Sequence, residues 1–175
     1  MRTISNFILK MLNKIIVVLC AFIVLSCNNA SFPDPNRRMN MNTNPVAVTL
    51  ETELQNGDLI AILVFQNIST HSVFLDKYTA YLADEPINNL FKIADKNGVL
   101  LDYSGIQIKR RFNKNDFVEL KAGASVKASV ALNDWYKFQQ GEHTYSILYS
   151  GFNHSYEKQK IFEMTSNEAV VKYVK

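Results

Sequence analysis

The chain has 175 residues, and its 19 Lys and Arg against 16 Asp and Glu give a formal net charge of +3 at pH 7. Residues 1–26 hold three of the basic residues and no acidic one, so 19 minus 3 leaves 16 basic against 16 acidic residues beyond them. A neutral chain does not recognise nucleic acid or another polyanion by bulk charge. The roughly 130 residues from residue 45 onward are enough for one domain with a core.

An apolar segment runs from Ile15 to Leu25, immediately after Lys14. This segment is too short to span a bilayer comfortably, and its basic flank and small-residue exit are typical of a secretory signal peptide. Its last residues, Val24-Leu25-Ser26-Cys27, resemble the bacterial lipobox. The resemblance implies cleavage before Cys27, a thioether-linked diacylglycerol on its sulfur, and an acyl chain on the new amine.

Two alternatives stay open in this region. Cys20 is a competing thiol, although it lies within the apolar run and follows the bulky Leu19, and both cysteines could instead belong to a membrane helix. Translation could start at Met1 or at Met11, since a lysine precedes the apolar run in either case.

Cleavage before Cys27 divides the chain into a signal peptide (1–26), a lipidated flexible tether (27–44) and a domain (45–175). The tether is predicted from its many Asn residues and its lack of a hydrophobic period. No Asp follows Cys27, which favours anchoring to the outer membrane of a bacterial envelope. Cys27 would be the only cysteine of the processed chain, so no intramolecular disulfide is expected.

The rest of the chain shows the two-residue period of β-strands. Residues 46–55 alternate apolar and polar side chains, Asn56-Gly57 is a strong hairpin signal, and residues 59–68 are apolar on both faces, as in a central strand. A helical turn is predicted only at 133–138. Further strands are predicted at 90–94, 99–103, 106–112, 116–120, 125–132, 143–149, 160–164 and 169–174, and less clearly within 71–82. About eight to ten short strands predict an all-β fold, an immunoglobulin-like antiparallel β-sandwich in one domain.

Residue types that serve catalysis are present, but not at the spacings that catalysis requires. The histidines His71, His143 and His154 fall on three different elements, and no HExxH pair is present to bind zinc. Ser104-Gly105 lacks the first half of a nucleophile elbow. We therefore expect no enzyme, no metal and no cofactor apart from the covalent lipid. A metal site assembled from His71, His143 and a carboxylate is the alternative.

Two clusters are candidates for contacts with a partner. The densest basic run is Lys109, Arg110 and Arg111, which suits an acidic protein surface or anionic lipid headgroups. Its alternative is a solvated edge strand kept soluble by charge. One turn-like segment gathers the aromatic residues Trp135, Tyr136 and Phe138, whose alternative role is a corner of the core.

A series of short pieces occurs between Leu90 and Tyr149: Leu90-Phe91, Gly98-Val99, Tyr103-Ser-Gly105, Ile108-Lys109-Arg110, Asp116-Phe-Val-Glu-Leu120, Ala122-Gly-Ala-Ser125, Val130-Ala-Leu132, Tyr136, Gly141 and Tyr149. Their order resembles the β-rich region that precedes the catalytic domain of deuterolysin-like (peptidyl-Lys) zinc metallopeptidases. The resemblance implies a sandwich domain without its protease domain, so no catalytic residue is carried over.

The chain departs from the family's pattern at one point. The family tends to place a tyrosine two residues after the glycine, whereas His143 stands there and Tyr145 follows it. Either the strand is shifted by two residues, which keeps the same face, or the hydrogen bond of this corner is made differently.

We expect a lipid-anchored, non-enzymatic protein of the bacterial cell envelope that binds another protein. The resemblance suggests a specific partner, a secreted zinc metallopeptidase that the domain would inhibit or confer immunity against. The alternatives are a lipoprotein that binds a carbohydrate or another small ligand, and a structural lipoprotein of the envelope.

Overall fold

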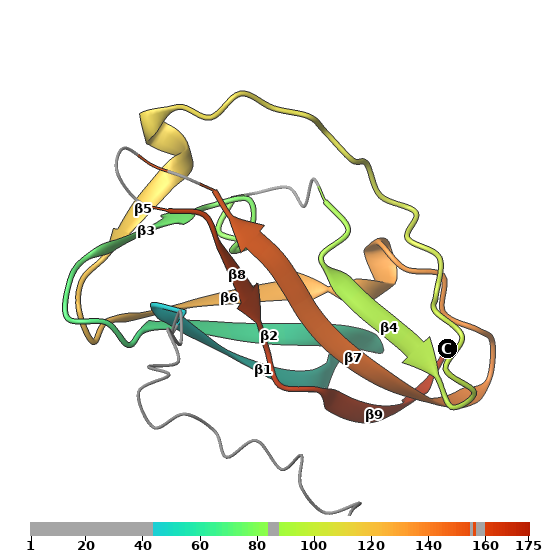
Figure 1. The fold of residues 1–175 in the computed structure, drawn as a ribbon. Helices are drawn as coiled ribbons and strands as arrows, with labels where there is room; N and C mark the ends of the chain where they lie inside the picture. Colours follow the sequence, from blue (N-terminus) through green and yellow to red (C-terminus); the bar gives the residue numbers. More distant parts are fainter. Residues whose placement is uncertain (1–43, 84–87, 155, 157–159) are drawn as a thin grey trace, which may run out of the picture. The chain divides into compact units, whose positions relative to one another are not determined.

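The computed structural model describes residues 44–83, 88–154, 156 and 160–175 (Figure 1). The signal peptide, the lipidation site at Cys27 and nearly all of the predicted tether lie outside these residues and stay predictions. The regular structure in the described residues is β-strand, apart from two short 3-10 helices, η1 (Lys114–Asp116) and η2 (Leu132–Asp134). The all-β prediction is confirmed, and η2 overlaps the segment where the sequence predicts a helical turn.

The first sheet places β2 between β1 and β6, with antiparallel pairing on both sides. Its strands are β1 (Val46–Gln55), β2 (Asp58–Asn67) and β6 (Ser125–Ala131). The β1–β2 turn has positive φ at both central residues, 52° at Asn56 and 94° at Gly57. These values are what a two-residue hairpin needs to match the twist of its strands, and Asn-Gly supplies them at low cost.

The second sheet is built on the long central strand β7, which pairs with β4 along one edge and with β8 and then β9 along the other. These strands are β4 (Phe91–Asp95), β7 (Glu142–Asn153), β8 (Phe162–Thr165) and β9 (Ala169–Val174). A separate antiparallel pair is formed by β3 (Val73–Asp76) and β5 (Phe117–Leu120).

The two larger sheets pack face to face and enclose the core (Figure 1). Leu63 and Phe65 of β2 and Ile147 and Tyr149 of β7 are all completely buried. The rings of Phe65 and Tyr149 meet edge to face, with centroids 5.5 Å apart. Burial of each such side chain contributes about 1.5–3 kcal/mol. The period-two pattern of the sequence therefore determines which face of each strand is inside.

The immunoglobulin-like assignment stays a prediction that the strand order supports. In that fold one sheet contains strands A, B and E in adjacent positions, and the other contains C, F and G. The orders β1-β2-β6 and β4-β7-β8/β9 correspond to these two sets. The β3–β5 pair has no counterpart in these two sets: in the chain, β3 follows the B-like strand β2, and β5 precedes the E-like strand β6.

The corner at the start of β7 is formed by Tyr145. The Tyr145 side chain is completely buried, and its hydroxyl accepts a hydrogen bond from the Gln139 N–H at 3.2 Å. Gly141, between these two residues, has a φ of 88°. Tyr145 thus makes a side-chain hydrogen bond to the backbone at this corner, and the shift of the strand relative to the family's pattern stays a prediction.

Two predicted strands are absent from the described residues. Residues 99–101 only fold back along β4, with the Leu101 N–H donating to the Ile93 carbonyl at 2.8 Å, and residues 106–112 are irregular. The alternation in 106–112 misled the prediction because its apolar side chains face solvent, with Ile106 exposed by 57% and Ile108 by 46%. The side chain that turns inward from this segment is Arg110.

Side-chain groups close several strand edges by taking the place of a neighbouring strand. The Asn167 side-chain amide accepts from the Leu50 N–H at 2.8 Å and donates to the Leu50 carbonyl at 3.0 Å, on the edge of β1 that faces away from β2. The Asn153 side chain does the same for β3, bonding to the Asp76 N–H and the Phe74 carbonyl. Such caps satisfy edge groups that would otherwise pair with another chain.

Candidate edge-strand binding site

The first sheet has an open edge along the side of β6 that faces away from β2. The Asn67 N–H donates to the Ala124 carbonyl at 2.9 Å, immediately before β6 begins. Hydrogen-bonded pairs alternate along an antiparallel ladder, so the even-numbered residues 126–130 bond to β2 and the odd-numbered residues 127–131 direct their N–H and C=O groups outward. Ala131 is the N-cap of η2, so its carbonyl belongs to the first turn of that helix. In the described residues, nothing bonds to the outward backbone groups of Lys127 and Ser129.

Other edges differ from this one. The β1 edge is capped at Leu50 by Asn167, and the β4 edge is covered by residues 99–101 and by the Tyr136 hydroxyl, which bonds to both backbone groups of Phe91. The outer edge of β9 also lacks a strand partner in the described part of the chain. Both edges carry a lysine, Lys172 on β9 and Lys127 on β6, and what sets the β6 edge apart is the pocket beside it.

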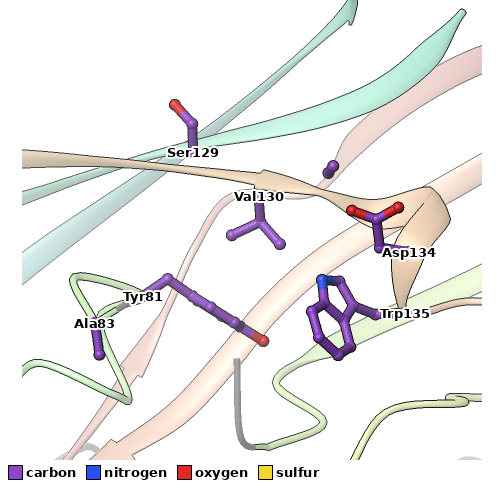
Figure 2. A pocket seen from close by; sticks show the side chains of 7 residues that line it. Tyr81, Ala83, Ser129, Val130, Asp134 and Trp135 are labelled. Atoms are coloured by element: carbon purple, nitrogen blue, oxygen red, sulfur yellow. The ribbon is translucent and has the colours of Figure 1, made fainter. Parts of the chain in front are cut away.

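A pocket of about 200 Å³ lies beside the open edge of β6 (Figure 2). The residues that line the pocket include Tyr81, Ala83, Ser129, Val130, Asp134 and Trp135, which Figure 2 labels. Figure 2 shows the Tyr81 ring and the Trp135 indole on the side of β6 to which Val130 points, while the Ser129 side chain points to the opposite side. The pocket therefore has aromatic walls next to a strand edge that is free to form hydrogen bonds.

Tyr81 reaches the pocket through an unusual backbone conformation. Its φ is 53°, which is uncommon for a residue with a large side chain. The turn is fixed by the Ala80 N–H, which donates to the Asp76 carbonyl at 2.9 Å, and by the Leu82 N–H, which donates to the Lys77 carbonyl at 2.7 Å. Burial of the Tyr81 ring raises the pKa of its hydroxyl well above the usual value, so the group stays neutral.

Trp135 is held by its backbone and leaves one polar group free. It follows η2, and its carbonyl accepts from the Ser104 N–H at 2.7 Å and from the Ser104 hydroxyl at 3.1 Å. A Cβ atom added at Gly105 would lie 2.8 Å from Cε3 of the indole, so this glycine lets the chain pack closely against Trp135. In the described residues, nothing accepts a hydrogen bond from the indole N–H, which points into the pocket (Figure 2).

Asp134 adds a negative charge at the rim of the pocket. Its side chain is exposed, and no described Lys, Arg or His forms an ion pair with its carboxylate. Lys127 is the basic residue of β6, and it is not among the residues that line the pocket. The pocket therefore presents aromatic faces, an indole N–H and one unpaired carboxylate.

Of the predicted aromatic contact cluster, only Trp135 lies at the pocket. Tyr136 is 3% exposed and Phe138 is 5% exposed, so the prediction that these two contact a partner is wrong. The Phe138 ring packs edge to face against Tyr145 and Tyr173, at 5.0 and 5.1 Å between centroids. The alternative role, a corner of the core, describes both residues.

The three residues of the predicted basic run have different environments in the structure. Lys109 and Arg111 are exposed, whereas the Arg110 side chain is only 15% exposed and forms an ion pair with the fully buried carboxylate of Asp76. Its Nη1 lies 3.0 Å from Oδ2 of Asp116, in ion-pair range although not aligned as a hydrogen bond. Partner contact through Arg110 is therefore corrected to a structural role.

Arg110 is further enclosed by aromatic rings. Its guanidinium carbon lies 4.2 Å from the Tyr78 ring centroid and 4.5 Å from that of Phe112. The imidazole of His154 lies tilted against Phe112, with 4.1 Å between the ring centroids. Partial burial lowers the pKa of His154 despite the opposing effect of Asp76. None of the residues in this cluster lines the pocket beside β6.

The three histidines occupy separate places. His71 contacts the Thr70 hydroxyl at 2.9 Å, and Nε2 of His143 lies 2.8 Å from the Gln140 carbonyl at the start of β7, while His154 follows the end of that strand. Within the described ranges, no three His, Cys, Asp or Glu side chains gather as metal ligands. The same part of the chain contains no helix long and apolar enough to cross a membrane.

Sequence reasoning did not identify Tyr81, Ser129 or Asp134 as site residues. Tyrosine is not a residue type that favours positive φ, so nothing in the sequence indicates the turn at Tyr81. Ser129 matters through its backbone, whose exposure depends on β6 having a neighbour on one side only. Neither the available protein-family models nor the curated proteins give a match to the chain.

Proposed function

We propose that the chain is a lipid-anchored, non-enzymatic protein of the bacterial envelope whose immunoglobulin-like domain binds another protein at the open edge of β6. The observation that carries this proposal is the set of outward backbone groups on Lys127 and Ser129, which lies beside the pocket of Tyr81 and Trp135. A partner strand would add to the sheet and place its side chains at the pocket. The lipid on Cys27 would hold this site near the membrane.

The size of the pocket favours a protein partner over a small molecule. Small-molecule sites usually enclose about 300–1,000 Å³. A space of about 200 Å³ suits a single side chain better, particularly where a strand edge beside it supplies backbone hydrogen bonds. The narrower version, in which the partner is a secreted zinc metallopeptidase, rests on the sequence resemblance between Leu90 and Tyr149.

The proposed function can be tested by comparing two proline variants of the full chain. Ser129→Pro removes an outward N–H of β6 and no bond to β2, so the fold should be kept. Val170→Pro is the matched control: the Gly141 N–H donates to the Lys175 carbonyl, which places the Val170 N–H on the outer edge of β9. We expect a partner to co-purify stoichiometrically from envelope extract with the wild type and with Val170→Pro, but not with Ser129→Pro. Equal recovery with all three chains would contradict the proposed site.

The lipid anchor is tested separately. In cells given labelled palmitate, the wild-type chain should become labelled and fractionate with the membrane. Cys27 supplies the sulfur that takes the thioether-linked diacylglycerol and, after cleavage, the amine that is acylated. Cys27→Ala should incorporate no label and accumulate as the unprocessed precursor. Cys20→Ala is the control and should behave as the wild type. Label on the Cys27→Ala chain would refute the assignment.

A further inference from the structure

We propose that the occupant of the β6 edge is an extended peptide segment whose lysine or arginine side chain enters the pocket between Tyr81 and Trp135. This inference rests on the proposed function, in which the same edge binds a protein, and adds the chemistry of the segment that is bound. It is argued from the geometry of the edge, from the composition of the pocket and from its charge.

The edge selects an extended segment. Its outward N–H and C=O groups lie on Lys127 and Ser129, two residues apart, which is the spacing at which a neighbouring strand presents its own groups. Successive side chains of such a strand point to opposite faces of the sheet. One of them would therefore lie on the face of Val130, where the pocket opens, and the next would lie on the face of Ser129.

The pocket selects a cation. Aromatic faces attract a positive charge placed over them, and indole does so more strongly than the other rings. Trp135 provides such a face, and the largely buried Tyr81 ring, which stacks on Phe91, forms the wall beside it. Asp134 provides a carboxylate at the rim with no basic partner in the described part of the chain. Lysine and arginine can lay an apolar stem along the rings and keep the charged end near the rim. An acidic side chain would be repelled by Asp134.

Trp135 is the only tryptophan in the chain, so tryptophan fluorescence reports on the pocket alone. The full chain in detergent is titrated with a fluorescein-labelled, acetylated peptide of alternating valine and threonine with one central lysine. A second peptide carries norleucine at the centre, which keeps the alkyl stem and removes the charge. Anisotropy of the label gives affinity, and Trp135 emission shows whether the pocket is the place of contact.

We expect the lysine peptide to bind about five- to tenfold more tightly than the norleucine peptide, as one cation–π contact and one exposed ion pair together would give. Asp134→Asn should reduce this preference to about threefold or less, since the ring contact remains. Glu51→Gln, an exposed acid on β1 at the opposite edge of the same sheet, should leave it unchanged. Ser129→Pro should abolish binding of both peptides.

Several results would overturn the inference. Equal affinity for the two peptides, with both lost in Ser129→Pro, would exclude the cation and leave the proposed function standing. Lysine-peptide binding that survives Ser129→Pro would indicate a charge contact that does not use the edge. If neither peptide binds while the envelope partner is still lost in Ser129→Pro, the edge binds a different surface. Loss of a symmetric dimer in Ser129→Pro, without peptide binding, would identify a second copy of the chain as the occupant.

Discussion

Replacing Arg110 with methionine should lower the free energy of unfolding by about 3 kcal/mol, as expected when one partner of a buried ion pair is removed. Methionine keeps much of the side-chain volume but leaves the Asp76 carboxylate, which is completely buried, without its cation. The neutral donors that remain, the Thr79 hydroxyl at 2.8 Å and the Tyr78 N–H at 3.2 Å, do not balance the charge. Chemical denaturation followed by circular dichroism measures the change.

The neighbouring arginine is a matched control for this prediction. Arg111 is exposed and has no ion pair in the described residues, so Arg111→Met should change the free energy of unfolding by no more than about 0.5 kcal/mol. Adding Asp76→Asn to Arg110→Met should restore part of the lost stability, because the unpaired charge is removed. Equal effects of Arg110→Met and Arg111→Met would mean that the buried pair is not stabilising.

Asn153→Ala should lower the free energy of unfolding by about 3 kcal/mol, because it removes the side-chain amide that bonds to two backbone groups of β3. The Asp76 N–H donates to the Asn153 side chain at 2.9 Å, and the Phe74 carbonyl accepts from it at 3.0 Å. Asn153 is completely buried, so water cannot easily replace the lost amide. Thermal and denaturant unfolding of the purified chain provide the measurement.

Asn167 makes the same pair of bonds at an exposed position and therefore provides the comparison. Its amide bonds to both backbone groups of Leu50, but its side chain is open to solvent. Asn167→Ala should cost only about 1 kcal/mol, since water can take the place of the amide. A loss at Asn167 as large as that at Asn153 would show that burial does not set the cost of these caps.

Much of the fold follows from local pattern. The Asn56-Gly57 dipeptide predicts the β1–β2 hairpin, because few residues accept positive φ at both positions. The alternation in 125–132 and 143–149 predicts the inward faces of β6 and β7, because burial on one face fixes register. The same reasoning fails for 106–112, where alternation is present but no neighbouring strand is available for pairing.

Less of the candidate site than of the fold could be predicted from the sequence. Trp135 was identified because it is an aromatic residue in a turn, but Tyr136 and Phe138 belong to the same pattern and are buried. In a short turn, each residue points in a direction set by tertiary contacts, such as the bonds between the Tyr136 hydroxyl and the backbone of Phe91. No period in the sequence encodes such directions. Likewise, the open edge of β6 depends on which strands are neighbours, a property of topology.

The Asn167 cap has a consequence for how copies of the chain could assemble. An endless fibre would need the β6 edge of each copy to continue the sheet onto the β1 edge of the next, a head-to-tail arrangement that never closes. Asn167 already occupies the backbone groups of Leu50 in the middle of that β1 edge. Self-association through this sheet is therefore restricted to β6 against β6, which ends at two copies.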